Sequence, residues 1–556
     1  SVFDTDIIRN TDVFTGGFNA EYGGRVSSIM DIKTKDGNKK KFGGKLTANT
    51  FGSKLLLEGP LSKNQKSSFV FSGKTSYLDK SSDIFYKEPL FTFDENGLPY
   101  SYTDLYGKIS LHGNNGSKFN IFGFNFQDLV DYENISKLSW KSNGIGSEFI
   151  LIPGNSPVLI EGNFAYSSYK ISLDEAASPL RESGISGFNM GFDFTYFKPK
   201  SKIKYGFDVH GYATDFLTYN SVNTPITQNE NTSEFSGYIN YQYTSTRLII
   251  EPGFRIQKYT LGLSPEPRLG IKYIVNEKTR LKLASGFYSQ NILSTSSDRD
   301  VVNLFSGIIS SPEEIPTQPN GDEYASKIQK AKHIITGIEF DVNNQIDFQV
   351  EAYIKDFNQL TNINRNMTSD DDDTFIIETG IARGIDALIK YNSKKLYVWL
   401  VYSLGQVKRD DGVREYSPHF DRRHNVNFVT SYKFGKKQDW KFDARWNLGS
   451  GFPFTQTQGF YENITFSDGI NTDYTSTNGD LGIQYAELNN GRLPYYHRLD
   501  ISLAKNITFK NNSKLNITAS VTNAYNRENI FYFNRVKYDR VNQLPLMPSL
   551  GMSLTF

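Results

Sequence analysis

Six histidines and a few acidic clusters are the residues of this sequence whose types could bind a metal. His419 and His424 flank Asp421 in "SPHFDRRHN", and imidazole and carboxylate groups are ligands of zinc and related metals. A metal site there would need a further ligand beside the two histidines at suitable spacing, and Asp421 is the only nearby candidate. The favoured interpretation is a hydrogen-bonded junction between a loop and a strand, with a metal site as the alternative.

Other short motifs fail on their spacing. "SDDDDT" places Asp370–Asp373 in a row, but a calcium loop of the EF-hand type needs spaced acids, a glycine and a distal glutamate. These acids therefore indicate a solvated loop tip. "SGKTS" (Ser72–Ser76) has Ser68 where a phosphate loop requires its first glycine. The chain has no cysteine, which excludes thiol enzymes and zinc thiolates. No G-x-S-x-G motif occurs. The sequence favours a non-enzyme without a cofactor; a Ser-His catalyst stays the alternative.

Composition points to a membrane barrel. The formal net charge of +1 offers no field to attract nucleic acid. Only 38% of the residues are hydrophobic, yet 14% are aromatic, and mean hydropathy is −0.47. No apolar run reaches the roughly 18 residues of a membrane-spanning helix. A membrane β-barrel also has a polar average, because its apolar residues alternate with polar ones.

Alternation dominates the chain. In "LNITASVTN", the apolar residues Leu515, Ile517, Ala519 and Val521 take every second position, which is the period of a strand with one apolar face. Helical spacing is rare, and the best candidate is a short helix around Asp322–Lys332.

Two kinds of connection separate the strands. The short ones, rich in Gly, Asn, Pro, Ser and Lys, suit tight hairpins. They lie near Ser62–Lys66, Gly113–Ser117, Pro153–Pro157, Lys198–Ser201, Thr244–Thr246, Asn276–Lys278, Asn343–Gln345, Asn392–Lys395, Gly435–Gln438 and Lys510–Ser513. Longer polar segments alternate with them, such as Leu78–Thr103, Ile292–Lys330, Thr361–Glu378, Ser450–Tyr496 and Arg527–Leu546.

The number of connections predicts the size of the barrel. Ten short turns, with both chain ends on the turn side, imply eleven long loops and 22 strands. Outer-membrane barrels have short periplasmic turns and long surface loops, and a 22-stranded barrel has a plugged lumen. The alternative, a soluble propeller or sandwich array, would show a repeat. In the terminal "PSLGMSLTF", Leu550, Met552, Leu554 and Phe556 share one face, as expected of a last strand that closes a barrel against the first.

The opening of the chain carries a resemblance. "DIIRNTDVFTGGFNAEYGGRVSSIMDIKTKDG" (Asp6–Gly37) resembles the last part of the plug of TonB-dependent outer-membrane receptors. "PRLGIKYIVNEKTRLKLASGFYSQ", "FDRRHNVNFVTSYKF" with "NLGSGFPFT", "YYHRLDISL" with "SVTNAYNREN", and the terminal stretch resemble the barrel of the same family. We therefore expect an all-β fold, a 22-stranded antiparallel transmembrane β-barrel with a partial N-terminal plug in its lumen. Residues 1–41 would form the C-terminal part of the plug domain, and residues 42–556 would form the barrel with its long surface loops.

The resemblance implies a transporter of the bacterial outer membrane. Such receptors import a scarce nutrient, such as a metal chelate, a vitamin, an oligosaccharide or a peptide, when a TonB-type inner-membrane motor pulls on the plug. The family's plug is far longer than the segment before Gly43, so the motor would act through a missing upstream segment. If the plug is truly reduced, the alternative is a structural or accessory subunit of a larger outer-membrane assembly or secretion complex.

Two sets of site residues follow. Turns with φ > 0 or close backbone contacts in the plug would be made by Gly16, Gly17, Gly23 and Gly24. Glu21 and Arg25 would be buried charges that pair with the barrel wall or with each other. Ligand contacts from the long loops would be Tyr86, Phe91, Arg299, Arg365, Phe454 and Tyr461, although packing and membrane-interface girdles are the commoner use of such aromatics. Expected partners are outer-membrane lipid and lipopolysaccharide, the TonB-type motor, and a surface lipoprotein or other envelope proteins, with no nucleic acid.

Overall fold

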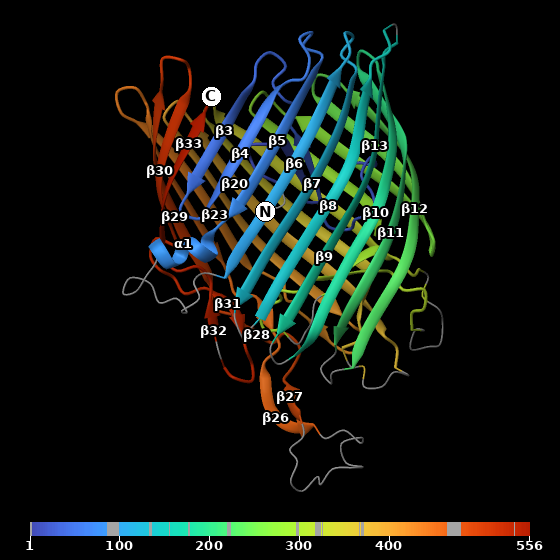
Figure 1. Ribbon diagram of the computed structural model, residues 1–556. Coiled ribbons are helices and arrows are strands. Elements are labelled where there is room, and N and C mark those ends of the chain that lie inside the picture. The colour runs from blue at the N-terminus through green and yellow to red at the C-terminus, as the bar shows by residue number, and fades with distance from the viewer. Residues whose placement is uncertain are drawn as a thin grey trace.

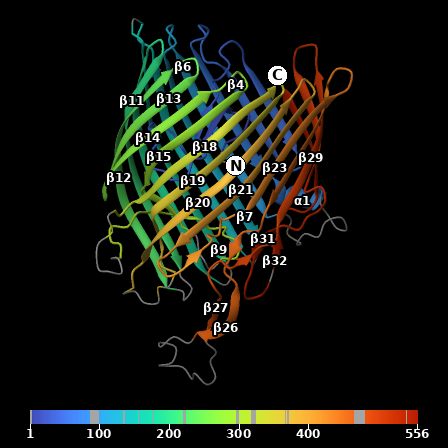
Figure 2. The same ribbon diagram turned by 180° about the vertical axis from the view of Figure 1, so that it is seen from behind.

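In a computed structural model, strands with alternating polar and apolar residues close into one barrel, and the N-terminal segment lies inside it (Figures 1 and 2). The structure describes residues 3–85, 99–132, 136–154, 156–175, 178–219, 224–295, 300–316, 324, 326–365, 367, 372–463, 480–538 and 540–556. All strand pairs of the wall are antiparallel. Successive side chains of a strand point to opposite faces, so each outward side chain is followed by an inward one. This alternation is what the sequence predicted.

The wall has 22 long strands, as predicted. They are β3 (Gly43–Asn49), β4 (Gly52–Pro60), β5 (Ser67–Ser76), β6 (Tyr100–His112), β7 (Lys118–Tyr132), β8 (Ser136–Leu151), β9 (Val158–Glu175), β10 (Ser178–Phe197), β11 (Ser201–Tyr219), β12 (Pro225–Thr244), β13 (Leu248–Tyr259), β14 (Gly262–Ile274), β15 (Thr279–Gln290), β18 (Gln329–Asn343), β19 (Ile346–Ile363), β20 (Phe375–Asn392), β21 (Leu396–Asp410), β23 (His424–Phe434), β24 (Trp440–Gly449), β29 (Tyr496–Thr508), β30 (Lys514–Thr522) and β33 (Met547–Thr555). A two-residue strand, β22 (Glu415–Tyr416), extends the edge of β21.

The last strand closes the barrel against the first. β33 pairs with β30 on one side and with β3 on the other, from Lys45 opposite Thr555 to Asn49 opposite Gly551. Outward-facing Leu550 and Met552 are 59% and 56% exposed in the isolated chain. A closed sheet leaves no unpaired edge in lipid, and this apolar exterior identifies an outer-membrane barrel.

All ten predicted short connections are hairpin turns, and they gather at one end of the barrel (Figure 1). The prediction that every connection at the other end is long was wrong. Only two residues join β3 to β4, and two join β13 to β14. A hairpin needs only a tight turn. The alternation pattern of the strands therefore does not determine how long the loops at this end are. We call the two ends the turn end and the loop end.

The longest loops carry structure of their own. They contain α1 (Leu78–Phe85), β16 (Ile292–Thr295) with β17 (Gly307–Ser310), β25 (Pro453–Phe454) with β28 (Gly491–Arg492), β26 (Thr457–Asn463) with β27 (Asp480–Tyr485), and β31 (Ile530–Phe533) with β32 (Arg540–Asn542). The helix expected around Asp322–Lys332 is not formed where this stretch is described, because β18 begins at Gln329 and its wall pairing takes the backbone hydrogen bonds. Within the described residues, no helix is both long and apolar enough to cross a membrane.

The N-terminal residues contact the inner face of the wall from Asp4, which binds Lys54, to Asp36, which binds Ser110. We call residues 3–41 the plug-like segment. They contain a small antiparallel sheet of β1 (Ile8–Phe14) and β2 (Ile29–Thr34). The loop between the two strands, residues 15–28, runs along the inner faces of β11 to β19. The glycine-rich stretch of the sequence is this loop.

Candidate functional site

The side chain of Arg255 on β13 holds the loop of the plug-like segment by its carbonyl groups. Arg255 is only 1% exposed. Its Nη1 donates to the backbone oxygens of Ala20 (3.2 Å) and Glu21 (3.0 Å). Its Nη2 forms an ion pair with Asp208 at 3.1 Å. A guanidinium offers five donors in a rigid fork, so one side chain can bind both the wall and the loop.

Arg268 on β14 is a second anchor of the same kind. Its Nη1 donates to the backbone oxygens of Asn19 (2.6 Å) and Tyr22 (2.5 Å), and its Nη2 to Glu266 of the wall (2.6 Å). The guanidinium also lies 4.3 Å from the ring centre of Tyr288, where the ring's negative face attracts a cation. Arg255 and Arg268 together make an arginine clamp on residues 19–22.

Contacts with the wall and left-handed backbone angles explain the glycines of this loop. A Cβ atom at Gly23 would lie 2.1 Å from Nε of Arg255, so a side chain and the guanidinium cannot share that space. Gly17 and Gly24 have φ angles of +62° and +67°, in the left-handed region that glycine enters without steric cost. At Gly16 a Cβ would lie 2.8 Å from the Ile335 side chain. Close approach to the wall therefore favours glycine at positions 16 and 23, and the backbone conformation favours it at positions 17 and 24.

The two charges of the loop meet partners on the wall. Glu21 forms an ion pair with Lys204 of β11 at 2.5 Å. Arg25 hydrogen bonds with Tyr212 and lies close enough to Glu234 for electrostatic attraction. Among the described residues, Glu21 and Arg25 form no ion pair with each other. Of the two interpretations open from the sequence, the structure has the one in which both charges face the wall.

Lysines of the wall bind the two ends of the plug-like segment. Near its start, Lys54 of β4 pairs with Asp4 at 3.0 Å and also with Asp6, and Lys45 of β3 pairs with Asp6 at 2.9 Å. Burial alone would raise the pKa of Asp6, but the bonds from Lys54 and Lys45 outweigh it and lower that pKa. The segment is thus held by acid-to-lysine pairs as well as by the arginine clamp.

Asp36 makes the corresponding anchor where the plug-like segment leaves the lumen. Its Oδ1 lies 2.9 Å from Lys118 and 3.2 Å from Lys108. Burial would raise the pKa of Asp36, but the hydrogen bond from Lys118 and the charge of Lys108 outweigh it and lower the pKa from 3.8 to about 2.

This lowered pKa predicts a pH dependence of folding. A carboxylate whose pKa falls on folding stabilises the fold above its unfolded pKa, and the contribution is lost as pH falls through the folded value. We expect Asp36→Asn to lower the free energy of unfolding in urea by roughly 1–2 kcal/mol at pH 7. The variant should also flatten the wild-type loss of stability between about pH 4 and pH 2. If the free energy of unfolding varies with pH in the same way in Asp36→Asn and in the wild type, the Asp36 anchor contributes nothing to stability.

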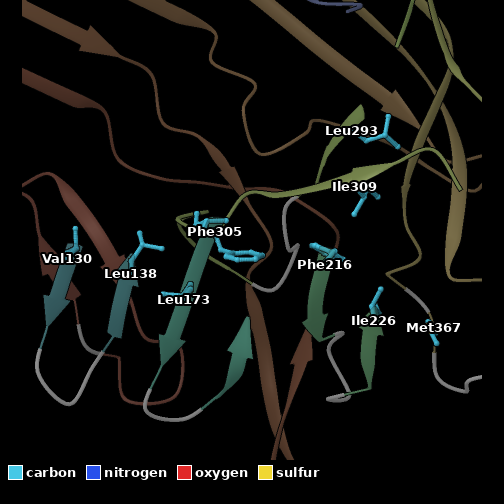
Figure 3. Packing of buried hydrophobic residues seen from close by; sticks show 10 residues of the cluster. Val130, Leu138, Leu173, Phe216, Ile226, Leu293, Phe305, Ile309 and Met367 are labelled. Atoms are coloured by element: carbon cyan, nitrogen blue, oxygen red, sulfur yellow. The ribbon is translucent and has the colours of Figure 1, made fainter. Parts of the chain in front are cut away.

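At the loop end, the β16–β17 hairpin folds back into the barrel mouth (Figure 3). Ile309 of β17 and Leu293 of β16 are 0% and 2% exposed, and they pack with Phe216 and Ile226 from the inner faces of β11 and β12. The apolar cluster continues across the ends of β7 to β9. A loop of the wall therefore covers part of the mouth through apolar packing.

Arg181 ties this cover to two neighbouring loops. Its Nη1 forms an ion pair with Asp300 at 2.8 Å, and its Nη2 one with Glu175 at 2.5 Å. Glu175 also accepts a hydrogen bond of 2.9 Å from Tyr532 of β31. Arg181 of β10 and Glu175 at the end of β9 thus join the loops that follow β15 and β30 to the wall.

The predicted ligand contacts are not gathered into one site where the structure describes them. Arg365 is held inside the loop layer, where its guanidinium binds Glu378 (2.6 Å), Asp411 (2.7 Å) and the hydroxyl of Tyr416 (2.9 Å). Three of the six predicted contacts, Tyr86, Phe91 and Arg299, lie outside the described residues.

The other two predicted contacts lie on separate hairpins. Phe454 is half-buried in the β25–β28 pair, and Tyr461 is 42% exposed on β26, in the hairpin that extends beyond the barrel (Figure 1). Aromatic packing of a loop on the wall does occur: Phe531 of β31 lies 5.5 Å from Tyr132 at the end of β7, ring centre to ring centre.

The "SPHFDRRHN" stretch forms a junction between a loop and a strand. Asp421 is fully buried, and it accepts hydrogen bonds from the backbone of Val407 (2.8 Å) and from Arg492 (2.6 Å). His424 bonds instead with the hydroxyl of Tyr402 at 3.0 Å. Over the described part of the chain, no three His, Asp or Glu side chains are grouped to hold a metal. Asp370 and Asp371 lie outside that part, and "SGKTS" lies in β5.

The clamp residues Arg255 and Arg268 were not among the predicted site residues. Alternation along "GFRIQKY" and "PRLG" does place both side chains on the polar face. A charge in the middle of a predicted strand, on its inward face, was the available signal. The partner could not be read, because it lies more than two hundred positions away along the chain.

Comparison with known proteins shows likeness at the level of structure. No family model matches the chain, and no curated protein sequence does. The FrpB iron transporter of Neisseria meningitidis has a similar structure, with a TM-score of 0.69 at 12% identity over 100% of this chain and 88% of that one. The ferric enterobactin receptor PfeA of Pseudomonas aeruginosa has a TM-score of 0.65 at 11% identity, over 100% of this chain and 86% of that one. The outer membrane transporter YddB of Escherichia coli has a TM-score of 0.65 at 9% identity, over 100% of this chain and 85% of that one.

These neighbours are named as transporters and receptors, and each has most of its length covered. Their likeness supports the resemblance carried by the opening and closing motifs of the sequence. The chain therefore has the fold of the TonB-dependent outer-membrane receptors: a closed 22-stranded barrel, with a plug-like segment in its lumen.

Proposed function

We propose that this barrel imports a scarce nutrient across the outer membrane, with residues 1–41 as the end of a plug and residues 42–556 as the barrel. A TonB-type inner-membrane motor would supply the force. The substrate classes are those expected from the sequence: a metal chelate, a vitamin, an oligosaccharide or a peptide. The solved neighbours named as iron and siderophore receptors support the first of these.

The polar character of the seat of the plug-like segment carries this proposal. The loop between β1 and β2 is held by the arginine clamp, by Lys204, and by Lys355, which donates to the backbone oxygens of Thr15 and Ser27. Each of these bonds joins polar groups, so water can take the place of either partner once force has moved the segment. Together the bonds hold the segment at rest, and under force they can be replaced by bonds to water.

The experiment locks the segment to the wall. Ala20 and Gly253 face each other: a Cβ at Gly253 would lie 3.1 Å from that of Ala20 and 2.3 Å from Oδ1 of Asn240, whose side chain must turn aside. A disulfide needs a Cβ separation of about 3.5–4.5 Å, so a small shift of the loop would allow the bond to form. The wild-type chain has no cysteine to interfere. Cells carrying Ala20→Cys/Gly253→Cys should lose uptake of one labelled compound from a panel of ferric siderophores, cobalamin, oligosaccharides and peptides. Reduction should restore that uptake, and each single variant should retain it.

A panel in which wild type and a deletion strain take up every compound equally would contradict the importer. Of the predicted ligand contacts, Tyr86, Phe91, Arg299, Phe454 and Tyr461 stay proposals, each testable by alanine substitution in the same assay. Arg365 stays one as well, but its alanine variant would also remove the contacts to Glu378 and Asp411.

A second candidate is a structural subunit of a larger outer-membrane assembly, and one observation favours it. Strands β9 to β12 are 18 to 20 residues long, about twice what crosses a bilayer. Their outward positions become polar toward the loop end, as at Ser168, Ser186 and Asn231, which occupy one register level. This polar wall would suit a surface lipoprotein or another envelope protein. Co-purification of such a protein in fixed ratio, with the nutrient panel unaffected, would favour the second candidate.

A further inference from the structure

An apolar groove with two arginines lies on the wall between β18 and β23. Its volume is about 450 Å³. Four aliphatic side chains that line it point outward and are 57%, 53%, 49% and 38% exposed: Ile334, Ile354, Ile385 and Leu404. Arg383 and Arg423 also line it. Outward side chains of a membrane barrel contact lipid, so the groove opens to the bilayer.

The arginines lie at the loop-side boundary of the apolar band. β20 ends at Asn392 in a short turn, and Arg383 comes nine positions before it (392 − 383). At about 3.3 Å per residue and a tilt near 45°, this is roughly 20 Å above the turn end. The apolar band of such barrels is about 25 Å tall. The four aliphatic side chains lie at nearly the same height, because Ile334 and Ile354 are in register with Arg383. The groove therefore lies at the outer boundary of the band, near the level of lipid headgroups.

The side chain of Arg383 is oriented by its neighbour. Its Nε and Nη2 both donate to Oε1 of Gln406 on β21, at 3.0 and 2.8 Å. These bonds leave Nη1 for another acceptor. Arg423 has an acidic neighbour, Asp421, but at 3.7 Å, and its side chain is 35% exposed. Two guanidinium groups thus stand over an aliphatic groove, where a phosphate is the matching anion.

The acidic groups named near the groove each have a basic neighbour. Asp356 of β19 sits opposite Lys332 of β18 in the strand register, so its charge is offset by that lysine. Lys408 of β21 forms an ion pair with Glu415 at 3.3 Å. After these pairings, Arg383 has no ion pair within the part of the chain that the structure describes, and Arg423 shares Asp421 with Arg492.

We propose that this groove is a binding site for one phosphorylated lipid of the leaflet at the loop end. An acyl chain would lie along the three isoleucines and Leu404, and the phosphate would accept hydrogen bonds from Arg383 and Arg423. A lipid bound at this position would contact the outer face of the wall from β18 to β23. The inference rests on the barrel lying in a membrane and is independent of transport.

Native mass spectrometry of the purified barrel in detergent tests the site. The probes are phosphatidylglycerol and diacylglycerol with identical acyl chains, and inorganic phosphate alone. We expect one phosphatidylglycerol adduct at a concentration at least tenfold below that needed for diacylglycerol. Arg383→Gln/Arg423→Gln should abolish this preference. Lys141→Gln is the matched control, because Lys141 is an exposed, outward lysine at a similar height on β8.

Three results would overturn the proposal. Equal binding of the two lipids would remove the role of the phosphate. An equal loss from Lys141→Gln would indicate a general effect of surface charge. Displacement of the lipid by inorganic phosphate alone would indicate an anion site without an acyl groove. If the double variant does not fold, Arg383→Lys provides the test, since it keeps the charge but loses the planar fork, and the lipid preference should then fall in part.

Discussion

Replacing Arg255 by methionine is expected to increase amide hydrogen exchange in residues 19–26 by on the order of 100-fold. The variant leaves the carbonyls of Ala20 and Glu21 without their donor and leaves the carboxylate of Asp208 without its ion-pair partner. Each hydrogen bond to a charged group contributes roughly 1.5–3 kcal/mol, so the loss of two corresponds to about 3 kcal/mol or more in the opening equilibrium.

Arg280→Met is the matched control for this variant. Arg280 is also a wall arginine with strong ion pairs, to Glu339 and Asp341, but these partners belong to the wall. It should leave exchange in residues 19–26 unchanged. Equal exchange in Arg255→Met and wild type would mean that the clamp does not hold the loop.

The second large effect is expected from Ile309→Asp, at the centre of the cover over the barrel mouth. Removal of a buried isoleucine costs about 2–5 kcal/mol, and a carboxylate without a partner in this apolar cluster adds to that cost. The β16–β17 hairpin should therefore detach. Its docking bonds run from the backbone of Ile308 to Ser183 (2.8 Å) and of Ser310 to Gln228 (3.0 Å), so both amides should exchange at least 100-fold faster.

Ile308→Asp controls for the introduced charge. Ile308 is the adjacent residue, and its side chain faces the other side of the hairpin and is only half-buried. We expect less than a tenfold change in exchange at Ser310. If both variants exchanged at the wild-type rate, the hairpin would be held by its polar bonds and not by the apolar cluster.

The wall could be predicted from the sequence because its determinants are local. Each short turn carries its own Asn, Gly, Ser or Lys, and each strand its own alternation, as in β30 and β33. Closure followed from the apolar face of the last strand. The loop end could not be predicted in the same way, since packing against distant strands decides whether a loop folds into the mouth, as the β16–β17 hairpin does.

The site was predicted only in part, for a related reason. The glycines and charges of the plug-like segment are unusual locally, so their type could be noted, but Lys204 and Arg255 are far away in the chain. Arg365 shows the opposite error, because a charged loop residue suggests a ligand contact until its partners Glu378 and Asp411 are placed beside it. α1 has eight residues, too few for a periodic signal.

The most direct test of the central claim, that the plug-like segment leaves its seat during energised transport, is the labelling of a single cysteine at Ala20 in living cells. Ala20 is 0% exposed against the wall. With Lys63→Cys, in an exposed turn, as the control, a small maleimide should react with Ala20→Cys at least tenfold faster in energised cells supplied with the imported nutrient than in cells treated with a proton uncoupler. Equal protection of Ala20→Cys under both conditions, while Lys63→Cys reacts equally in both, would contradict the account and leave the barrel as a structural subunit.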